Sequence, residues 1–325
     1  MKLKRNIAFL TPLIVLTLLA ATLHVLPVSA ENSEKPIIVC TTNVLGSLVG
    51  EFVGDEADIV VLVRPGLCPA DYDMKPSDIY AVTHAKILFY HAMLGEFWLD
   101  TLLEAAGNEN LIRVMVPGDY NTPSGAKNCI NIAGGNLSVA LSMDLDDKIA
   151  EMLTAIDGVE GEIADEAQTL EVGSVKVICM MWLKPFVESV GFDVVATYNP
   201  PETLSAGDVT NLIETARSEG VALIIDNLQI STEFGEEIAS EVGAGHVVLT
   251  NFPGAVPKTS GLTQMLQYNA RQLFDGLRTW RTTRELRLQM ETMESQLTIF
   301  QAATSVAVII AIVEAVWLYM RRKER

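Results

Sequence analysis

The chain has 325 residues, of which 49% are hydrophobic, and it carries a formal net charge of −18 at pH 7. This length is enough for two domains that each bury a core of their own. Asp and Glu number 41 against 23 Lys and Arg, which argues against a nucleic-acid partner because nucleic acid repels a negatively charged protein.

The first 30 residues have the layout of a secretory signal peptide. Three basic residues within the first five positions precede an apolar run over 7–26, and Val28-Ser29-Ala30 offers small residues at the expected cleavage site. We therefore predict a signal peptide over 1–30. An uncleaved N-terminal anchor is the alternative reading of the same pattern.

Residues 31–143 are predicted to form an N-terminal α/β lobe. Its strands are expected where short apolar runs end in turn residues, at 36–42, 59–63, 87–90 and 111–116. Its helices are expected over 43–52, over 77–86 with Ser77 as N-cap, and from Glu96 onward. Residues 119–135 are rich in Gly, Pro and Asn and are expected to be a loop that carries Cys129 and can move.

Residues 144–172 are predicted to be linker helices, one over 144–156 and an acidic one over 160–172, and residues 173–277 a C-terminal α/β lobe. The strands of that lobe are expected at 175–180, 193–197, 222–226 and 246–250, and its helices at 183–190, 204–218 and 233–242. Alternating strands and helices imply parallel pairing. The predicted fold class is therefore α/β, with two doubly wound lobes of parallel sheets joined by a helix. Ligands of such folds bind beyond the carboxyl ends of the strands.

The C-terminal part is predicted to anchor the chain in a membrane. Residues 297–320 are long and apolar enough to cross a bilayer as a helix, and the basic tail 321–325 places that end in the cytoplasm. Glu314 lies close enough to the tail to reach the interface. We predict a single-pass protein of the cell membrane whose ectodomain lies outside.

Residues 278–296 are predicted to be a charged stalk helix between the second lobe and the membrane. Leu286, Met290, Met293 and Leu297 share one face of it. This spacing is compatible with a coiled coil, but two heptads alone do not establish one.

One stretch of the first lobe carries a dense run of recognisable motifs. They are Val53-Gly54-Asp55, Leu62-Val63-Arg64-Pro65-Gly66, Pro69, Tyr72-Asp73, Pro76-Ser77-Asp78, Phe89-Tyr90 and Glu96-Phe97-Trp98-Leu99. This stretch resembles the solute-binding proteins of metal-ion ABC importers of the zinc and manganese type. Residues 261–277, GLTQMLQYNARQLFDGL, are similar to the closing helix of that family. The resemblance covers residues 36–277.

The resemblance implies a binding protein that takes a metal ion between its lobes and delivers it to an ABC permease and its ATPase. Such proteins hold the metal with three histidines and a carboxylate, and these positions fall on Ala70, Ala140, Met180 and Asn251. The standard zinc or manganese site is therefore absent. By the same resemblance, Thr42 is expected beside the ligand. The connector helix is expected to be much shorter than in the family.

Other side chains that bind metals lie near these positions. The candidate metal ligands are Cys40, Cys68, His91, Cys179, Met180 and Asp226. The candidate ligand-cleft positions are Thr42, Ala70, Ala140 and Asn251. Thiolates, thioethers and imidazole suit Cu(I), or Zn in a rearranged site. Three alternatives stay open: cysteines that only pack in the core, disulfides with three connectivities, and a ligand that is not a metal.

We therefore predict a membrane-anchored extracellular solute-binding protein of an ABC-type metal-ion importer, with one Zn or Cu(I) ion at a non-standard site or no metal at all. The alternative is a surface binding or sensor module of the same fold that no longer transports a metal. The sequence holds no nucleophile elbow, phosphate loop or CxxC motif, so we predict no enzymatic activity.

Overall fold

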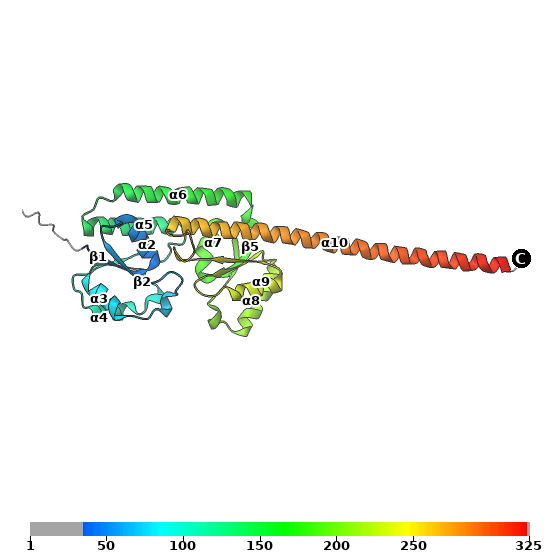
Figure 1. Cartoon of the computed structure of the whole chain (residues 1–325), viewed down its shortest axis with the longest axis horizontal. Helices are drawn as coiled ribbons and strands as arrows, with labels where there is room; N and C mark the ends of the chain where they lie inside the picture. Colours follow the sequence, from blue (N-terminus) through cyan, green and yellow to red (C-terminus); the bar gives the residue numbers. More distant parts are fainter. Residues whose placement is uncertain (1–34, 324–325) are drawn as a thin grey trace, which may run out of the picture. The chain divides into compact units, whose positions relative to one another are not determined.

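The computed structural model describes residues 35–323 and contains two four-stranded parallel sheets (Figure 1). The strand order is β2-β1-β3-β4 in the first sheet and β6-β5-β7-β8 in the second, and every pairing is parallel. The predicted α/β class with two doubly wound lobes is confirmed. The predicted signal peptide over 1–30 lies outside the described residues.

The elements follow one another in regular alternation. The strands of the first sheet are β1 (Ile37–Thr42), β2 (Asp58–Val63), β3 (Ala85–Tyr90) and β4 (Ile112–Met115). Those of the second sheet are β5 (Lys176–Met180), β6 (Asp193–Tyr198), β7 (Leu223–Asn227) and β8 (Gly245–Leu249). The α-helices are α2 (Asn43–Val53), α3 (Pro76–His84), α4 (Leu99–Ala106), α5 (Pro123–Leu141), α6 (Asp146–Thr169), α7 (Lys184–Val190), α8 (Ala206–Glu219), α9 (Glu233–Val242) and α10 (Leu262–Lys323). Short 3₁₀ turns include η1 (Pro69–Asp71) and η2 (Leu94–Glu96).

Helix α3 begins two residues earlier than the sequence suggested. Its N-cap is Lys75 and not Ser77, because Pro76 takes the first helical position, where the missing N–H costs nothing. The Asp78 carboxylate accepts a hydrogen bond from the Lys75 N–H at 2.9 Å and so closes the first turn. The helix ends at His84, since β3 starts at Ala85.

The loop predicted over 119–135 is wrong, because most of it belongs to α5. Thr122 caps this helix by accepting a hydrogen bond from the Gly125 N–H at 3.0 Å, and Pro123 follows at the first position. A Cβ atom on Gly134 would lie 2.6 Å from Cγ1 of Ile149 and 2.9 Å from Cζ of Phe52. Gly134, one of the glycines on which the loop prediction rested, therefore allows α5 to pack closely against its neighbouring helices.

The two linker helices predicted over 144–172 are one helix, α6, of 24 residues. Its buried residues recur at helical spacing without a break: Met152, Ile156, Val159, Ile163 and Ala167. Gly158 and Gly161 lie on the exposed side with no atom near an added Cβ, and neither interrupts the helix.

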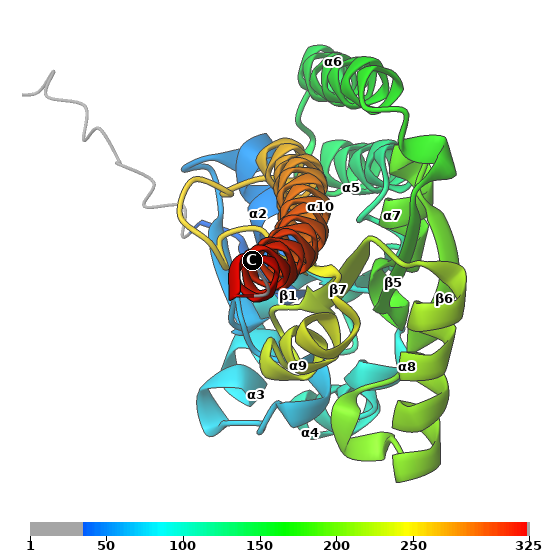
Figure 2. The same ribbon diagram turned by 90° about the vertical axis from the view of Figure 1, so that its right-hand side faces the viewer.

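Helices α5, α6 and α10 follow one side of the molecule and join the two sheets (Figures 1 and 2). One cluster of buried apolar residues extends from the first sheet through α5 and α6 to the second sheet. The Arg278 guanidinium pairs with Glu166 at 2.6 Å and ties α10 to α6. A second cluster fills the other face of the first sheet beneath α3 and α4. The two lobes therefore share a core on the helical side.

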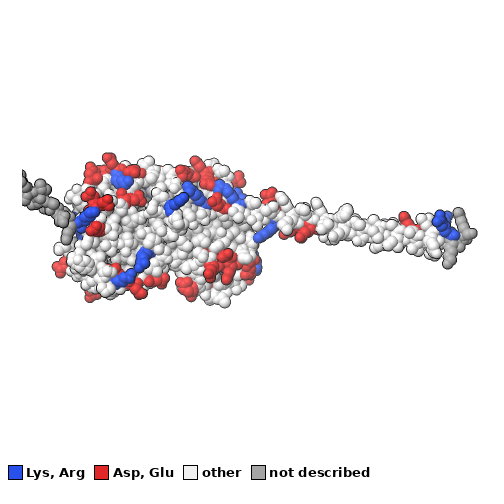
Figure 3. Space-filling view, in the orientation of Figure 1, with Lys and Arg blue, Asp and Glu red and all other residues white. Residues whose placement is uncertain are grey.

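Helix α10 is continuous over 62 residues and includes the segments predicted as closing helix, stalk and membrane span. It is the one described helix that is long and apolar enough to cross a membrane, and none of its most apolar window is buried. Acidic side chains cover the lobes, whereas the distal part of α10 is nearly free of charge until its end (Figure 3).

The contact at Gly134 gives a test of the helical side. We expect Gly134→Ala to lower the free energy of unfolding by about 1–3 kcal/mol, because the new methyl group overpacks the contact with Ile149 and Phe52. Gly135→Ala is the matched control on the same helix, with no atom within 4 Å of its Cβ. It should stabilise the chain by about 0.5–1 kcal/mol through helix propensity. Denaturant unfolding of both variants measures the difference, and equal effects would contradict the packing of α5.

Candidate ligand-binding site

Segments that follow the carboxyl ends of strands in both sheets meet at one place. The Asn121 amide, after β4, donates to the Trp182 carbonyl at 2.9 Å and to the side-chain oxygen of Asn251 at 3.3 Å. Trp182 follows β5 and Asn251 follows β8. We call this meeting of Asn121, Trp182 and Asn251 the lobe junction. It lies where ligands of doubly wound sheets bind, and it takes groups from both lobes.

His91 lies at the end of β3 beside this junction and is only 3% exposed. Its Nδ1 is 3.0 Å from the Val116 carbonyl and its Nε2 is 2.9 Å from the Thr42 hydroxyl. Because a carbonyl can only accept, Nδ1 carries the proton and the Nε2 lone pair accepts from Thr42. Burial lowers the pKa of His91 to about 4, so the ring is neutral at pH 7. The ring packs on Tyr120, and neither nitrogen is left for a metal.

Glu96 is a buried acid that the sequence did not single out as a site residue. Its carboxylate accepts from the His91 N–H at 2.9 Å, from the Ala92 N–H at 2.7 Å and from the Thr41 hydroxyl. Burial raises the pKa of Glu96, and these hydrogen bonds oppose the rise. Ala92 has a φ of +55°, a strained value for alanine, and Glu96 holds this turn in place. Glu96 therefore shapes the loop that carries His91.

The four cysteines are free thiols, and they are scattered over the fold. Cys40 lies in β1, Cys179 in β5 and Cys129 in α5, all buried, whereas Cys68 is half-buried in the loop after β2. Burial raises the pKa of Cys129 and Cys179 to about 12, and it also raises the pKa of Cys40 and Cys68. These thiols stay protonated at neutral pH, and those on the strands pack in the core.

Met180 and Asp226 are also engaged within the second lobe. The Met180 sulfur accepts from the Trp182 N–H at 3.4 Å. The Asp226 carboxylate accepts from the Gly235 N–H at 3.0 Å and from the Tyr198 hydroxyl, and lies 2.8 Å from Nε2 of His246. An added Cβ on Gly235 would lie 2.5 Å from this carboxylate, so the site closes tightly around it.

Two of the predicted cleft positions lie apart from the junction contacts. Ala70 is exposed in η1. Ala140 lies in the last turn of α5, about 27 Å along the helix axis from Thr122. Helix α5 carries Ala140 away from the strand ends, and residues 116–121 directly follow β4.

The six candidate metal ligands are not brought together as one site. Residues 35–323 contain no group of three or more His, Cys, Asp or Glu side chains placed to hold a metal ion. Beside the junction the chain offers amides and hydroxyls instead. Gln229 donates to the Thr250 hydroxyl at 2.9 Å and accepts from the Asn251 N–H at 3.0 Å.

Asn227, at the carboxyl end of β7, holds an unused hydrogen-bond donor. Its side-chain oxygen accepts from the Gln229 N–H at 2.8 Å. Its side-chain nitrogen is the one buried side-chain nitrogen or oxygen in the described part of the chain without a partner. Buried donors are nearly always satisfied, so this atom is available to a hydrogen-bond acceptor.

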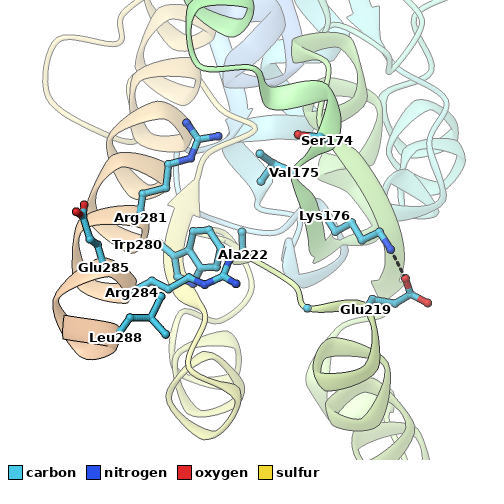
Figure 4. Close-up of a pocket in the computed structure, with 11 residues that line it drawn as sticks. Ser174, Val175, Lys176, Glu219, Ala222, Trp280, Arg281, Arg284, Glu285 and Leu288 are labelled. Atoms are coloured by element: carbon cyan, nitrogen blue, oxygen red, sulfur yellow. Dashed lines mark hydrogen bonds and ion pairs between the residues drawn. The ribbon is translucent and has the colours of Figure 1, made fainter. Parts of the chain in front are cut away.

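A cavity of about 490 Å³ lies away from the junction, between α10 and the amino-terminal ends of β5 and β7 (Figure 4). Trp280, Arg281 and Arg284 of α10 face it, opposite Lys176, which pairs with Glu219 (Figure 4). Amino-terminal ends of strands are the wrong edge for ligand capture in this fold. The cavity therefore shows which face of α10 is turned toward the second lobe.

Comparison with known proteins agrees with this architecture. The family model described as ZnuA, zinc-uptake complex component A, periplasmic, matches residues 38–128 and 139–276, which is more than half of the chain. The chain belongs to this family. It is a family of periplasmic solute-binding proteins and not of enzymes, as predicted.

Individual relatives are distant. The chain is 27% identical over 86 residues to the manganese-binding lipoprotein MntA of Halalkalibacterium halodurans, which is 26% of this chain and 29% of that protein. It is 25% identical over 85 residues to the metal ABC transporter substrate-binding lipoprotein SsaB of Streptococcus sanguinis, covering 25% and 28%. The chain thus spans under a third of the length of these relatives.

Solved structures resemble the chain over their whole length. A crystal structure of ZnuA superposes with a TM-score of 0.62 at 19% identity, over 75% of this chain and 99% of that one. The solute-binding protein FpvC from Pseudomonas aeruginosa in complex with Mn²⁺ superposes with a TM-score of 0.65 at 13% identity, over 76% and 99%. At these identities the likeness establishes the shared two-lobed fold.

Thiol reactivity tests the placement of the cysteines. We expect one of the four cysteines to react rapidly with Ellman's reagent in the folded full chain, because only Cys68 is partly exposed. All four should react after denaturation without a reductant. Cys68→Ser should remove the rapid phase. Two thiols or fewer in the denatured chain would contradict the free cysteines of the structure.

The pKa of His91 gives a pH test. Between its ordinary value of 6.5 and its folded value of about 4, the unfolded chain binds a proton that the folded chain does not. The contribution of His91 to the free energy of unfolding is therefore fully present above pH 6.5. It is lost as the pH drops toward 4, by an amount on the order of 3 kcal/mol.

The matched variants are His91→Gln and His84→Gln, the second at an exposed histidine on α3. Unfolding of the full chain in detergent is measured at pH 7 and at pH 4.5. The fall in stability should shrink in His91→Gln and persist in His84→Gln. An equal fall in both variants would mean that His91 is not buried in its neutral form.

Proposed function

We propose that the chain is the membrane-anchored solute-binding component of an ABC-type importer, and that it takes its ligand at the lobe junction and passes it to a permease. One observation carries this proposal: side chains from both lobes meet at the carboxyl ends of their strands, where Asn121 bonds Trp182 and Asn251. A ligand held from both sides stabilises the closed arrangement of the lobes. Membership of a solute-binding family supports the same role.

The ligand we propose is a polar solute bound by hydrogen bonds. The groups beside the junction are amides and hydroxyls, and the Asn227 side-chain nitrogen is a free donor there. The nearby imidazole of His91 is neutral and engaged on both nitrogens, and the Glu96 carboxylate already accepts three hydrogen bonds. Such a site suits a hydrogen-bond acceptor better than a bare divalent cation, which needs several carboxylate or imidazole ligands.

The second candidate is the metal-ion importer expected from the resemblance, with a soft ion in a rearranged site. Cys68 favours it, because this thiol is half-buried in the loop after β2 and makes no disulfide. Met180, at the carboxyl end of β5, would supply a thioether from the second lobe. Zinc or Cu(I) would be the ion that such ligands select.

The same proposal includes membrane anchoring through α10, with the lobes outside the cell and the tail in the cytoplasm. Residues 297–320 of this helix are apolar and exposed, and the Arg321 guanidinium lies 5.0 Å from the Trp317 ring near its end. An aromatic and basic end of this kind suits a membrane interface. An ABC permease and its ATPase are the proposed partners. A chain that binds a solute but no permease would instead be a surface sensor.

The experiment is native mass spectrometry with elemental analysis on the full chain, purified in detergent without a chelator. We expect a bound small molecule and less than stoichiometric zinc, manganese or copper. Asn121→Ala should reduce occupancy on the order of tenfold, through the loss of one buried hydrogen-bonding group. Asn131→Ala is the control, because its amide bonds only Lys127 within α5.

The possible outcomes separate the candidates. One metal ion per chain that is lost with Cys68→Ser would support the soft-metal importer and reject the hydrogen-bonded solute. Equal occupancy in Asn121→Ala and Asn131→Ala would place the ligand elsewhere and contradict capture at the junction.

A further inference from the structure

Helix α10 presents an uncovered apolar stripe that runs from the predicted stalk, 278–296, into the first turn of the proposed membrane span. The stripe consists of five residues at alternating spacings of four and three: Leu286, Met290, Met293, Leu297 and Phe300. Each of them is more than half exposed. This is the spacing of the core positions of a coiled coil, and the uninterrupted helix keeps all five on one face. We call this set the juxtamembrane stripe.

The juxtamembrane stripe lies on the side of α10 that is turned away from the cavity beside β5 and β7. Trp280, Arg284 and Leu288 line the cavity beside that lobe (Figure 4). Each residue advances about 100° around an α-helix, so Leu286 and Met290, two positions beyond Arg284 and Leu288, point to nearly the opposite side. On the stripe's own face, Thr279 and Thr283 still line a cavity beside β8, so a second helix can lie along this face only from Leu286 onward.

We propose that the juxtamembrane stripe binds the same stripe of a second copy of this chain, as a short parallel two-stranded coiled coil. The inference rests on the proposed membrane anchoring. A membrane span forces the α10 helices of both copies to run parallel and to leave the bilayer at the same residue. Identical residues then face one another in register. A parallel coiled coil with apolar core positions needs this arrangement.

The residues that flank the stripe permit this pairing. In a parallel pair, Gln289 of one copy lies opposite Glu294 of the other, and Gln296 lies opposite Gln301. None of these pairs sets like charges against one another. Upstream, the face continues as Thr279 and Thr283, so the contact begins at Leu286.

Membrane confinement explains why so short a stripe can hold a dimer. About two heptads are marginal for helices that meet in free solution. Two copies held in one bilayer meet at a much higher effective concentration, as linked binding sites do. The dimer should therefore depend on the anchor, with the two sets of lobes on its outer sides.

Cysteine cross-linking of the full chain in native membranes tests this interface. The background is Cys68→Ser, since the other three cysteines are buried. Met293→Cys places a thiol in the stripe, and Ser295→Cys places one on the opposite face as the matched control. On oxidation with copper phenanthroline, which takes up the electrons of the two thiols, Met293→Cys should form on the order of tenfold more disulfide dimer than Ser295→Cys.

A second variant and the mass of the product test whether the apolar stripe causes the cross-link and whether the partner is a second copy of the chain. Adding Met290→Glu to Met293→Cys should bring dimer formation down to the level of Ser295→Cys, because the new carboxylates oppose one another in the core. Equal cross-linking of Met293→Cys and Ser295→Cys would overturn the proposal. So would a product whose mass is not twice that of the chain.

Alkaline carbonate extraction of the same membranes separates this proposal from the anchoring on which it rests. A chain that stays in the membrane pellet but does not cross-link through Met293→Cys rejects the dimer alone. A chain that is extracted rejects both the anchoring and the dimer.

Discussion

The shared core on the helical side is the constraint on which the rest of the structure depends. Helix α5 packs on the first lobe, α6 packs on α5 and on α7 of the second lobe, and one cluster of buried residues includes strands of both sheets. Pulling the lobes apart on this side would expose apolar surface at a cost of about 25 cal/mol for each Å². The lobes are therefore fixed on one side and meet through polar groups on the other, at Asn121 and Asn251.

The polar residues near the strand ends are of two kinds: some bond only within one lobe, and others reach across between the lobes. His91 and Glu96 are buried and fully engaged with neighbours of their own lobe, so they hold the edge of the first sheet in shape. Asn121 and Asn251 reach across between the lobes, and Asn227 keeps a donor unused. A ligand would compete for the hydrogen bonds of Asn121, Asn251 and Asn227. It would leave the hydrogen bonds of His91 and Glu96 undisturbed.

Much of the fold could be predicted from the sequence, because its strands are short β-branched runs that end in turn residues. The parallel order follows from the alternation of strands with helices. Helix α5 could not be recognised in this way, because Gly134 is needed for close packing against Phe52 and Ile149, which are distant in sequence. In α6 the prediction of two helices missed that the buried positions continue at helical spacing through Gly158 and Gly161, which face solvent.

The site was harder to predict than the fold, because residue type alone does not say whether a side chain is free. Cys40, Cys179 and Asp226 were selected for their affinity for metals, and the structure uses them in cores or closed hydrogen-bond sets. Asn251 was found because the family resemblance placed the carboxylate ligand of the family at this position. Asn121 was missed because it lay in a segment read as a loop, although its position just before Thr122 and Pro123 marks a helix start at a strand end.

The most direct test of the central claim is an experimental structure of the full chain purified with the solute that it carries in its native membrane. The account predicts a small polar molecule at the lobe junction, hydrogen-bonded to Asn121 or Asn251 and touching both lobes. A ligand confined to the cavity beside Trp280, or a metal ion bound by thiols with the junction empty, would contradict it.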